Sequence, residues 1–257
     1  MPGRPDTVVS ALRAALSSDP GRPLVTFYDG ATGERVELSV TTFDNWVTKV
    51  ANLFADDLTL EPGDRIRVDL PPHWQSSVIL LGAWTAGLTV SLTTTAGDVA
   101  ARVIGPGADM STSMSGQVIS CSLRPLGGPS LIPLPAGWLD FGAEVPGQPD
   151  ILAMAPSVDA GGTAVHTDLG PKTHADLVRA ARDTASRLTL SPAARLLTDI
   201  NPATAAGLVA ALAAPLVAGS SVVLLMNVDR DTAATISGQE RVTASLWSEQ
   251  LGAGWPD

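Results

Sequence analysis

The residues best suited to chemistry lie in one short segment, residues 155–165, which contains the adjacent glycines Gly161 and Gly162. Two successive glycines can turn their backbone N–H groups toward one point, so the chemistry to expect there is binding of a phosphate or another anion. Two neighbours oppose it, because Pro156 has no N–H to donate and Asp159 adds a negative charge. At an effective dielectric constant of about 20, two unit charges about 4 Å apart repel by about 4 kcal/mol. The alternative interpretation is a surface loop that joins two strands.

Other catalytic arrangements find little support in the residues present. The histidines His73, His166 and His174 and the single cysteine, Cys121, do not have the spacing typical of a metal site. The sequence contains no Gly-x-Ser-x-Gly, the pattern of a hydrolase nucleophile, and no Gly-x-Gly-x-x-Gly after a strand. Cys121 lies in a strand-like segment, so we expect a packed thiol rather than a nucleophile.

Composition predicts a folded protein that does not bind nucleic acid or a membrane. Of the 257 residues, 45% are hydrophobic and only 16% are charged, which is enough apolar material for a sizeable core. The net charge of −10 repels nucleic acid and anionic lipid. The uncharged stretch between Asp199 and Asp229 contains Pro215 and Gly219, which favour a buried helix, turn and strand over a membrane span. The single cysteine and the lack of an initial secretory signal favour a cytoplasmic location.

Alternation and helical periodicity predict the elements that must position these residues. Helices are expected at residues 8–16, 43–54, 74–86, 173–188 and 205–217, and a polar helix or loop at 229–239. Strands are expected at residues 24–28, 35–38, 65–70, 88–93, 99–104, 117–123, 151–155, 196–200, 221–226 and 242–246. Residues rich in Gly and Pro at 105–107, 125–129 and 133–149 predict loops. The rhythm of strand, helix and strand favours parallel pairing through crossover helices.

Four sequence blocks occur in an order that resembles one known family. They are Leu60-Glu61-Pro62-Gly63-Asp64-Arg65, then Leu70-Pro71, then Ala83-Trp84-Thr85-Ala86-Gly87, and finally Pro215-Leu216-Val217-Ala218-Gly219. The AMP-binding, acyl-CoA-synthetase-like family has "L-x-P-G-D-R-V", "L-P-N", "A-x-x-A-G-x-V" and "P-L-x-x-G-A-x-V-V-L" in the same order. The resemblance covers nearly the whole chain, but only the first half of the large domain of that family.

The resemblance implies an α/β fold of two layered lobes. It would correspond to the first half of the large N-terminal domain of acyl-CoA synthetase-like enzymes, with their C-terminal domain absent. Carried over, residues 61–190 form the first α/β lobe, and residues 1–60 together with residues 191–257 form the second. Residues 1–257 would then be a single discontinuous two-lobed unit.

The resemblance also implies a remnant nucleotide loop. Family members bind ATP through "T-S-G-T-T-G-x-P-K-G", followed by a helix that starts near "S-H-x-x-L", and Thr173-His174-Ala175-Asp176-Leu177 matches that helix start. The loop itself has lost the alternation of Ser or Thr with Gly. Lys172 could replace the phosphate-binding cation or be a solvated surface lysine, and His174 could brace the loop rather than take part in catalysis. The remnant cofactor-binding residues are therefore Ser157, Gly161, Gly162, Thr163, Lys172 and His174.

Family enzymes also need a later acidic motif and a C-terminal lysine, and neither is recognisable in this sequence. We therefore expect no catalytic residue, no metal and no required cofactor, with ATP or AMP and Mg as the residual possibility. The leading hypothesis is a non-catalytic, truncated homologue that acts as a binding or assembly module for a protein partner or an acyl-like ligand. One alternative is the nucleotide-binding half of an adenylate-forming enzyme that another polypeptide completes. Another is a homo-oligomer that pairs through the truncated edge of its sheet.

Overall fold

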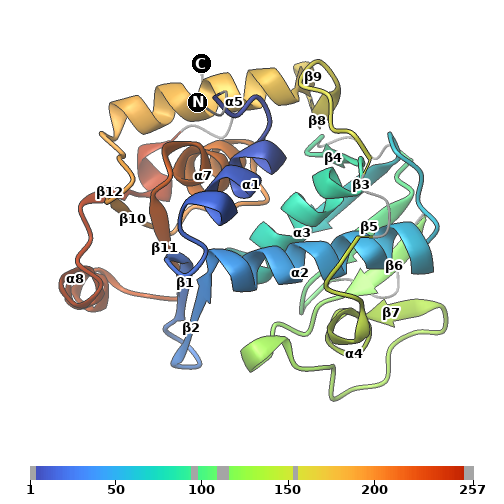
Figure 1. Cartoon of the computed structure of the whole chain (residues 1–257). Coiled ribbons are helices and arrows are strands. Elements are labelled where there is room, and N and C mark those ends of the chain that lie inside the picture. The colour runs from blue at the N-terminus through green and yellow to red at the C-terminus, as the bar shows by residue number, and fades with distance from the viewer. Residues whose placement is uncertain (1–3, 94–97, 109–115, 153–155, 252–257) are drawn as a thin grey trace.

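Two largely parallel β-sheets form the framework of the protein (Figure 1). The structure is a computed structural model, and it describes residues 4–93, 98–108, 116–152 and 156–251. The five-stranded sheet has the order β12-β10-β11-β1-β2 and contains β1 (Pro23–Asp29), β2 (Glu34–Ser39), β10 (Arg195–Thr198), β11 (Ser221–Met226) and β12 (Ala244–Leu246). The seven-stranded sheet has the order β7-β6-β5-β3-β4-β8-β9 and contains β3 (Arg65–Asp69), β4 (Thr89–Ser91), β5 (Ala101–Ile104), β6 (Gln117–Ser120), β7 (Trp138–Asp140), β8 (Thr163–Thr167) and β9 (Gly170–Thr173).

Parallel pairing follows the expected rhythm of strand, helix and strand. Strands β3 and β4 flank helix α3 in sequence and pair in parallel, with Ile66 opposite Val90. The pairs β1–β2 and β8–β9 are antiparallel hairpins. Gly30 and Gly33 lie in the turn of the β1–β2 hairpin, and Gly33 has the positive φ that such a turn requires.

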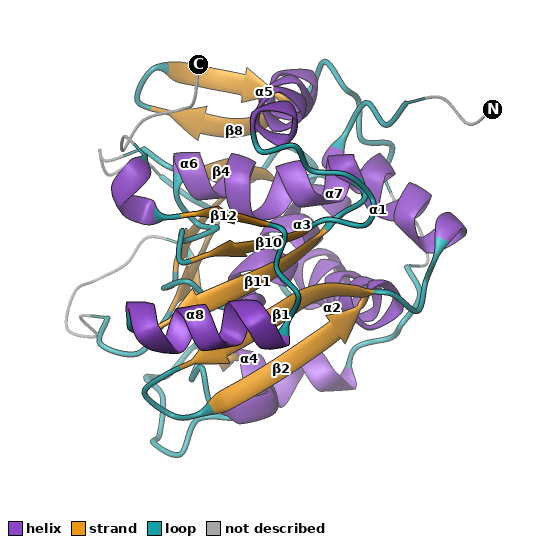
Figure 2. Cartoon of the chain, turned by 90° about the vertical axis from the view of Figure 1, so that its left-hand side faces the viewer, coloured by secondary structure: helices purple, strands orange, loops and turns teal. Residues whose placement is uncertain are grey.

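Helices pack between the sheets and on their outer faces. They are α1 (Val8–Ser18), α2 (Val40–Asn52), α3 (Trp74–Thr85), α4 (Phe141–Glu144), α5 (His174–Arg187), α6 (Ala205–Gly207), α7 (Ala214–Ala218) and α8 (Arg230–Gln239). Helices α2 and α3 lie across the middle of the molecule, and α3 contacts β1 of one sheet and both β3 and β4 of the other (Figure 1). Helix α8 lies on the outer face of the five-stranded sheet (Figure 2). Within the described residues, no helix combines the length and the apolar content that crossing a membrane requires.

Helix α3 is buried on every side. All of its residues from Trp74 to Thr85 are buried, which agrees with a sequence that carries no charge. Gly82 allows its close approach to α2, because a Cβ at this position would lie 2.6 Å from Cγ1 of Val50 and 3.1 Å from the carbonyl oxygen of Val47. One hydrophobic cluster runs from α3 into both sheets. The division of the chain into two lobes therefore stays a prediction, although the seven-stranded sheet draws its strands from residues 65–173 alone.

Several predicted elements need correction. The segment 151–155 was expected to be a buried strand, but Ile151 is 78% exposed, neither Ile151 nor Leu152 belongs to a strand, and residues 153–155 lie outside the described part. The Gly- and Pro-rich segment 133–149 contains β7 and α4 in addition to loops. Strand β9 was not predicted, since Pro171 argues against a central strand, but β9 is an edge strand and tolerates proline. The expected helix at 205–217 is a continuous run of α6, a π-helical segment Leu208–Ala213 and α7.

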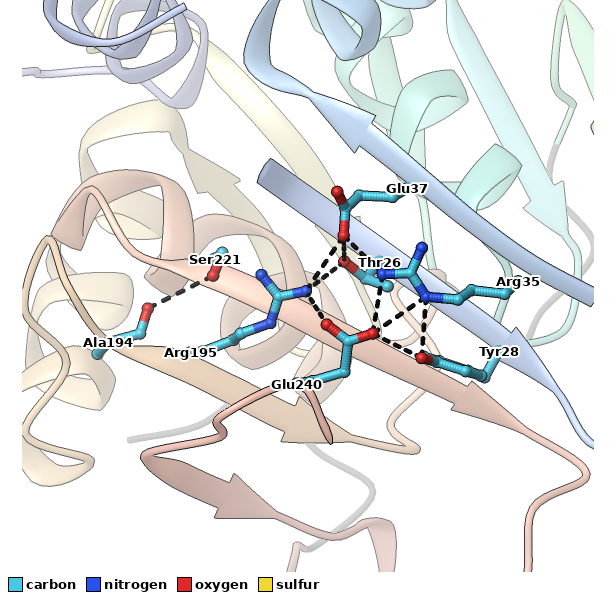
Figure 3. Close-up of polar contacts among 8 residues, drawn as sticks. All are labelled: Thr26, Tyr28, Arg35, Glu37, Ala194, Arg195, Ser221 and Glu240. Atoms are coloured by element: carbon cyan, nitrogen blue, oxygen red, sulfur yellow. Dashed lines mark hydrogen bonds and ion pairs between the residues drawn. The ribbon is translucent and has the colours of Figure 1, made fainter. Parts of the chain in front are cut away.

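A cluster of charged side chains fixes α8 to the outer face of the five-stranded sheet (Figure 3). Glu240, which directly follows α8, accepts hydrogen bonds from the Tyr28 hydroxyl and from the guanidinium groups of Arg35 and Arg195. Glu37 on β2 pairs with both arginines. Burial by itself would raise the pKa of Glu240, but the hydrogen bonds from Tyr28 and Arg35 and the charge of Arg195 hold it below its ordinary value. The cluster therefore joins strands β1, β2 and β10 to the end of α8.

The contact at Gly82 gives a test of the packing between α2 and α3. We predict that Gly82→Ala destabilises the protein by about 1–3 kcal/mol, because the new methyl group overlaps Val50 in a filled core. Gly238→Ala is the matched control, since a Cβ at this exposed position of α8 would meet nothing within 4 Å and should stabilise the helix by about 0.5–1 kcal/mol. Urea unfolding of the three proteins measures both effects. A Gly82→Ala variant as stable as the wild type would show that the two helices do not pack this closely.

Candidate functional site

A cavity of about 560 Å³ opens beside the loop 156–163, where the amino ends of three parallel strands meet. Arg65, Thr89 and Thr163 are the first residues of β3, β4 and β8, and all three line the cavity. Gly63 and Gly87, which precede two of these strands, also line it. The N–H of Gly63 donates to the carbonyl oxygen of Gly87 at 2.9 Å, so the two strand ends are held together at the cavity rim.

The glycine pair of the loop is already occupied by hydrogen bonds within the loop. The N–H of Gly161 donates to Oδ1 of Asp159 at 3.1 Å, and the N–H of Gly162 donates to the backbone oxygen of Asp159 at 3.0 Å. The loop is also bound to the start of α5, where the N–H of His174 donates to the oxygen of Gly162 at 3.0 Å. Asp159 lines the cavity as well. In this geometry the two glycine N–H groups donate to Asp159, and the Asp159 residue that accepts them also borders the cavity.

The structure brings four of the six predicted site residues to the cavity. Its lining includes Ser157, Gly162, Thr163 and His174, but neither Gly161 nor Lys172. Lys172 lies on the edge strand β9, where its partner in the antiparallel register is Val165.

His174 is a buried and neutral residue at the start of α5. Its side chain is 4% exposed and packs edge-on against Trp84, with ring centroids 6.0 Å apart. Burial lowers the pKa of His174 to about 4, although the charge of Asp159 opposes this shift. Thr173 and Asp176 form a capping box that fixes the first turn of the helix. A neutral imidazole supplies no positive charge for a phosphate near pH 7.

Among the described residues that line the cavity, the cation is Arg65, which the sequence analysis identified only as part of the strand expected at residues 65–70. Its side chain is half-buried, and Nη2 lies 3.4 Å from Nδ1 of His166 on β8. Burial, and then the charge of Arg65, lowers the pKa of His166 below its ordinary value. The alternation in β3 predicts one face for Arg65 and Arg67, but which of them borders a cavity depends on strands that are distant in sequence. No local signal identifies it.

The remaining candidates have structural surroundings. Cys121 follows β6, is 1% exposed, and has a pKa that burial raises well above its ordinary value. His73 is buried and caps α3, since its Nδ1 accepts from the N–H of Gln75 at 3.1 Å. Asn201, which follows β10, donates to the backbone oxygen of Leu70 at 2.7 Å. Throughout the described ranges, no three side chains of His, Cys, Asp or Glu gather as metal ligands would.

Comparisons with known proteins identify both a relative of similar length and the fold. No family model matches the chain. A protein of Mycobacterium tuberculosis (strain ATCC 25618 / H37Rv), described as a TIGR03089 family protein, is 33% identical over 248 residues, which are 94% of this chain and 99% of that protein.

Solved structures of synthetases and ligases share the fold. An acyl-CoA synthetase from Brucella canis has a TM-score of 0.76 and 19% identity, and the match covers 96% of this chain and 48% of that chain. A fatty acyl-adenylate ligase from L. pneumophila in complex with acyl adenylate and pyrophosphate has a TM-score of 0.68 and 13% identity, with coverage of 94% and 44%. The chain thus spans about half the length of these structures and has the fold of an N-terminal portion of such enzymes. The predicted fold class is confirmed.

The buried environment of His174 generates a pH prediction. Its folded pKa lies below the ordinary value of 6.5, so the unfolded chain takes up the proton first. The stability that neutral His174 contributes should therefore be complete above pH 6.5 and be lost as the pH falls from 6.5 toward about 4. Asp159→Asn should lower the pKa of His174 further, because it removes the carboxylate that raises it, whereas Asp183→Asn on the exposed face of α5 should leave it unchanged. An NMR titration of the His174 imidazole measures its pKa in the wild type and in both variants. An ordinary pKa for His174 in the wild type would contradict the buried geometry.

Proposed function

Because this chain belongs to the TIGR03089 family and has the fold of an N-terminal portion of acyl-CoA synthetases, we propose that it is a non-catalytic binding or assembly module. The observation that carries the proposal is the closure of the loop by Asp159. Activation of a carboxylate by ATP needs phosphates that are surrounded by donors and positive charge. Here the N–H groups of Gly161 and Gly162 already donate to Asp159, and His174 is neutral.

The electrostatic cost supports the same proposal. Asp159 lines the cavity, so a triphosphate placed there would bring several negative charges close to its carboxylate. Each such pair at about 4 Å costs about 4 kcal/mol at an effective dielectric constant of about 20. Opening the loop to free the two N–H groups would in addition break two hydrogen bonds, each worth about 0.5–1.5 kcal/mol. The L. pneumophila ligase, which holds pyrophosphate, is therefore a relative in fold whose phosphate chemistry this loop opposes.

A second candidate function rests on Arg65. Its guanidinium lines the same cavity and, among the lining residues that the structure describes, supplies the positive charge that could favour a phosphate of ATP or AMP with Mg. On this alternative the chain would be the nucleotide-binding half of an adenylate-forming ligase, and a separate polypeptide would complete it. We favour the first proposal because Asp159 offsets the single positive charge of Arg65.

The edge of the five-stranded sheet suggests how the module would assemble. An exposed edge strand invites pairing unless charged residues, proline or a bulge protect it. At one edge of the five-stranded sheet, strand β2 carries the charged residues Arg35 and Glu37. Strand β9, an edge of the seven-stranded sheet, contains Pro171. Strand β12, Ala244–Leu246, has neither charge nor proline and pairs with β10 on one side. We propose that β12 pairs with a second copy of the chain or with a strand of a protein partner.

Nucleotide binding tests the proposed loss of catalysis. We predict that millimolar ATP with Mg, or AMP, leaves the thermal unfolding of the wild type unchanged, whereas a true site at 100-fold its Kd would add about 2.7 kcal/mol. Asp159→Asn should be the variant that gains measurable nucleotide binding, with Asp183→Asn as the charge-matched control. Clear stabilisation of the wild type by ATP with Mg would favour the half-enzyme alternative. Formation of an acyl adenylate by the purified protein alone would overturn the proposal.

Oligomeric state tests the proposed edge pairing. We predict that light scattering detects a concentration-dependent dimer and that Ser245→Lys, which puts a charge in the middle of β12, shifts the protein to a monomer. Gln239→Lys adds the same charge on exposed α8 and should leave the dimer intact. A monomeric wild type at all concentrations would remove self-association and leave only a foreign strand as the partner of β12. A dimer that Ser245→Lys does not weaken would show that the contact lies elsewhere.

A further inference from the structure

We propose that the cavity beside Arg65 binds a small planar oxyanion of single negative charge, the group shared by bicarbonate and short carboxylates. The inference goes beyond the binding module proposed above by giving that module a ligand class, and it rests on that proposal in one respect: a triphosphate does not fill this cavity. The site lies at the amino ends of β3, β4 and β8. Ligands of open α/β sheets bind as a rule at the opposite, carboxyl ends of the strands.

Most N–H groups of the Arg65 guanidinium have no hydrogen-bond partner among the described residues. Among the described residues, no carboxylate lies within 4.0 Å of it, whereas Arg67 and Arg102 on β3 and β5 both pair with Asp69. The contact from Nη2 of Arg65 to Nδ1 of His166 is 3.4 Å, longer than the usual 2.7–3.2 Å of a hydrogen bond from nitrogen to oxygen. A guanidinium offers five N–H groups in a planar fork that matches the two oxygens of a carboxylate. Arg65 is thus a half-buried cation in a cavity, with most of its donors uncommitted.

His166 adds a donor without adding charge. Because a guanidinium can only donate, the contact with Arg65 favours the tautomer of His166 in which Nδ1 accepts and Nε2 carries the proton. This ring is neutral near pH 7, since burial and Arg65 lower its pKa. The hydroxyl groups of Ser157 and Thr163 line the same cavity. Arg65, His166 and the two hydroxyls therefore offer mainly donors, which is the arrangement that suits an oxyanion.

Asp159 determines which oxyanion fits. The charged side chains that line the cavity are Arg65 and Asp159, and the two histidines are neutral. A single negative charge can pair with Arg65 while it stays apart from Asp159. A second negative charge, as on phosphate near pH 8, has no further cation among the described lining residues to pair with and is repelled by Asp159. The cavity should consequently select bicarbonate or a carboxylate over phosphate.

Titration of the full chain at constant ionic strength tests the proposal. The probes are sodium bicarbonate, acetate, phosphate and chloride, and the observed signals are the backbone amides of Gly63, Gly87 and Thr89 at the cavity. Bicarbonate, acetate or both should shift these amides saturably in the millimolar range, with phosphate at least about tenfold weaker and chloride without effect. Arg65→Gln should raise the Kd at least about tenfold, and Arg67→Gln, on the same strand but paired with Asp69, should change it less than about twofold.

The outcomes are separable from those of the proposed function. Binding by bicarbonate alone or by acetate alone would support the site and identify the source of the oxyanion. No saturable shift with either probe, or equal binding to wild type and Arg65→Gln, would overturn the inference, whatever ATP does. Stabilisation by ATP with intact oxyanion binding would overturn the proposed function instead. If circular dichroism shows that Arg65→Gln is unfolded, Arg65→Lys, which keeps the charge and loses the planar fork, should bind more weakly than the wild type.

Discussion

The burial of one uncharged helix determines how the rest of the molecule is arranged. Helix α3 has no solvent-facing side, and the only way to cover all of it is to place a sheet or another helix on each flank. It contacts β1 of the five-stranded sheet, β3 and β4 of the seven-stranded sheet, and α2 through Gly82. Helix α3 also connects β3 to β4, which pair in parallel beside it. Arg65 and Thr89, the first residues of these two strands, line the cavity.

The loop beside this cavity has its glycine N–H groups hydrogen-bonded to an aspartate of the same loop. A pair of glycines is suited to presenting N–H groups to an anion. One aspartate two residues earlier accepts both of those N–H groups, through its side chain and through its own carbonyl. The same carboxylate adds negative charge to the cavity, and Arg65 across the lining offsets it. These two charges are the basis for our proposals that the site prefers a small ligand with one charge to a polyphosphate and that the protein is a binding module.

Local patterns made much of the fold predictable. The start of α5 could be located because Thr173 and Asp176 form a capping box within four residues, and the hairpin after β1 because Gly30 and Gly33 specify its turn. The elements that were not predicted are short or lie at an edge, such as β9 with its proline and the three-residue β7. There the local preference for strand structure is weak, and pairing with a neighbouring strand decides whether a strand forms.

The candidate site was less predictable than the fold. The sequence shows that the loop contains the charged residue Asp159. The hydrogen bonds from both glycine N–H groups to Asp159 depend on the turn that the loop adopts. The role of Arg65 depends on the meeting of β3, β4 and β8, which no local pattern encodes. Sequence similarity to the M. tuberculosis protein extends over nearly the whole chain, so its counterpart of residue 159 is the natural place to look for the same closed loop.

Hydrogen exchange at Gly161 and Gly162 tests the central claim most directly. If the loop is closed by Asp159, both amides should exchange slowly, and ATP with Mg should change neither their exchange rates nor their chemical shifts. Fast exchange of both amides in the free protein, followed by protection when ATP with Mg is added, would mean that the loop is open and binds phosphate, and the account given for this protein would be wrong.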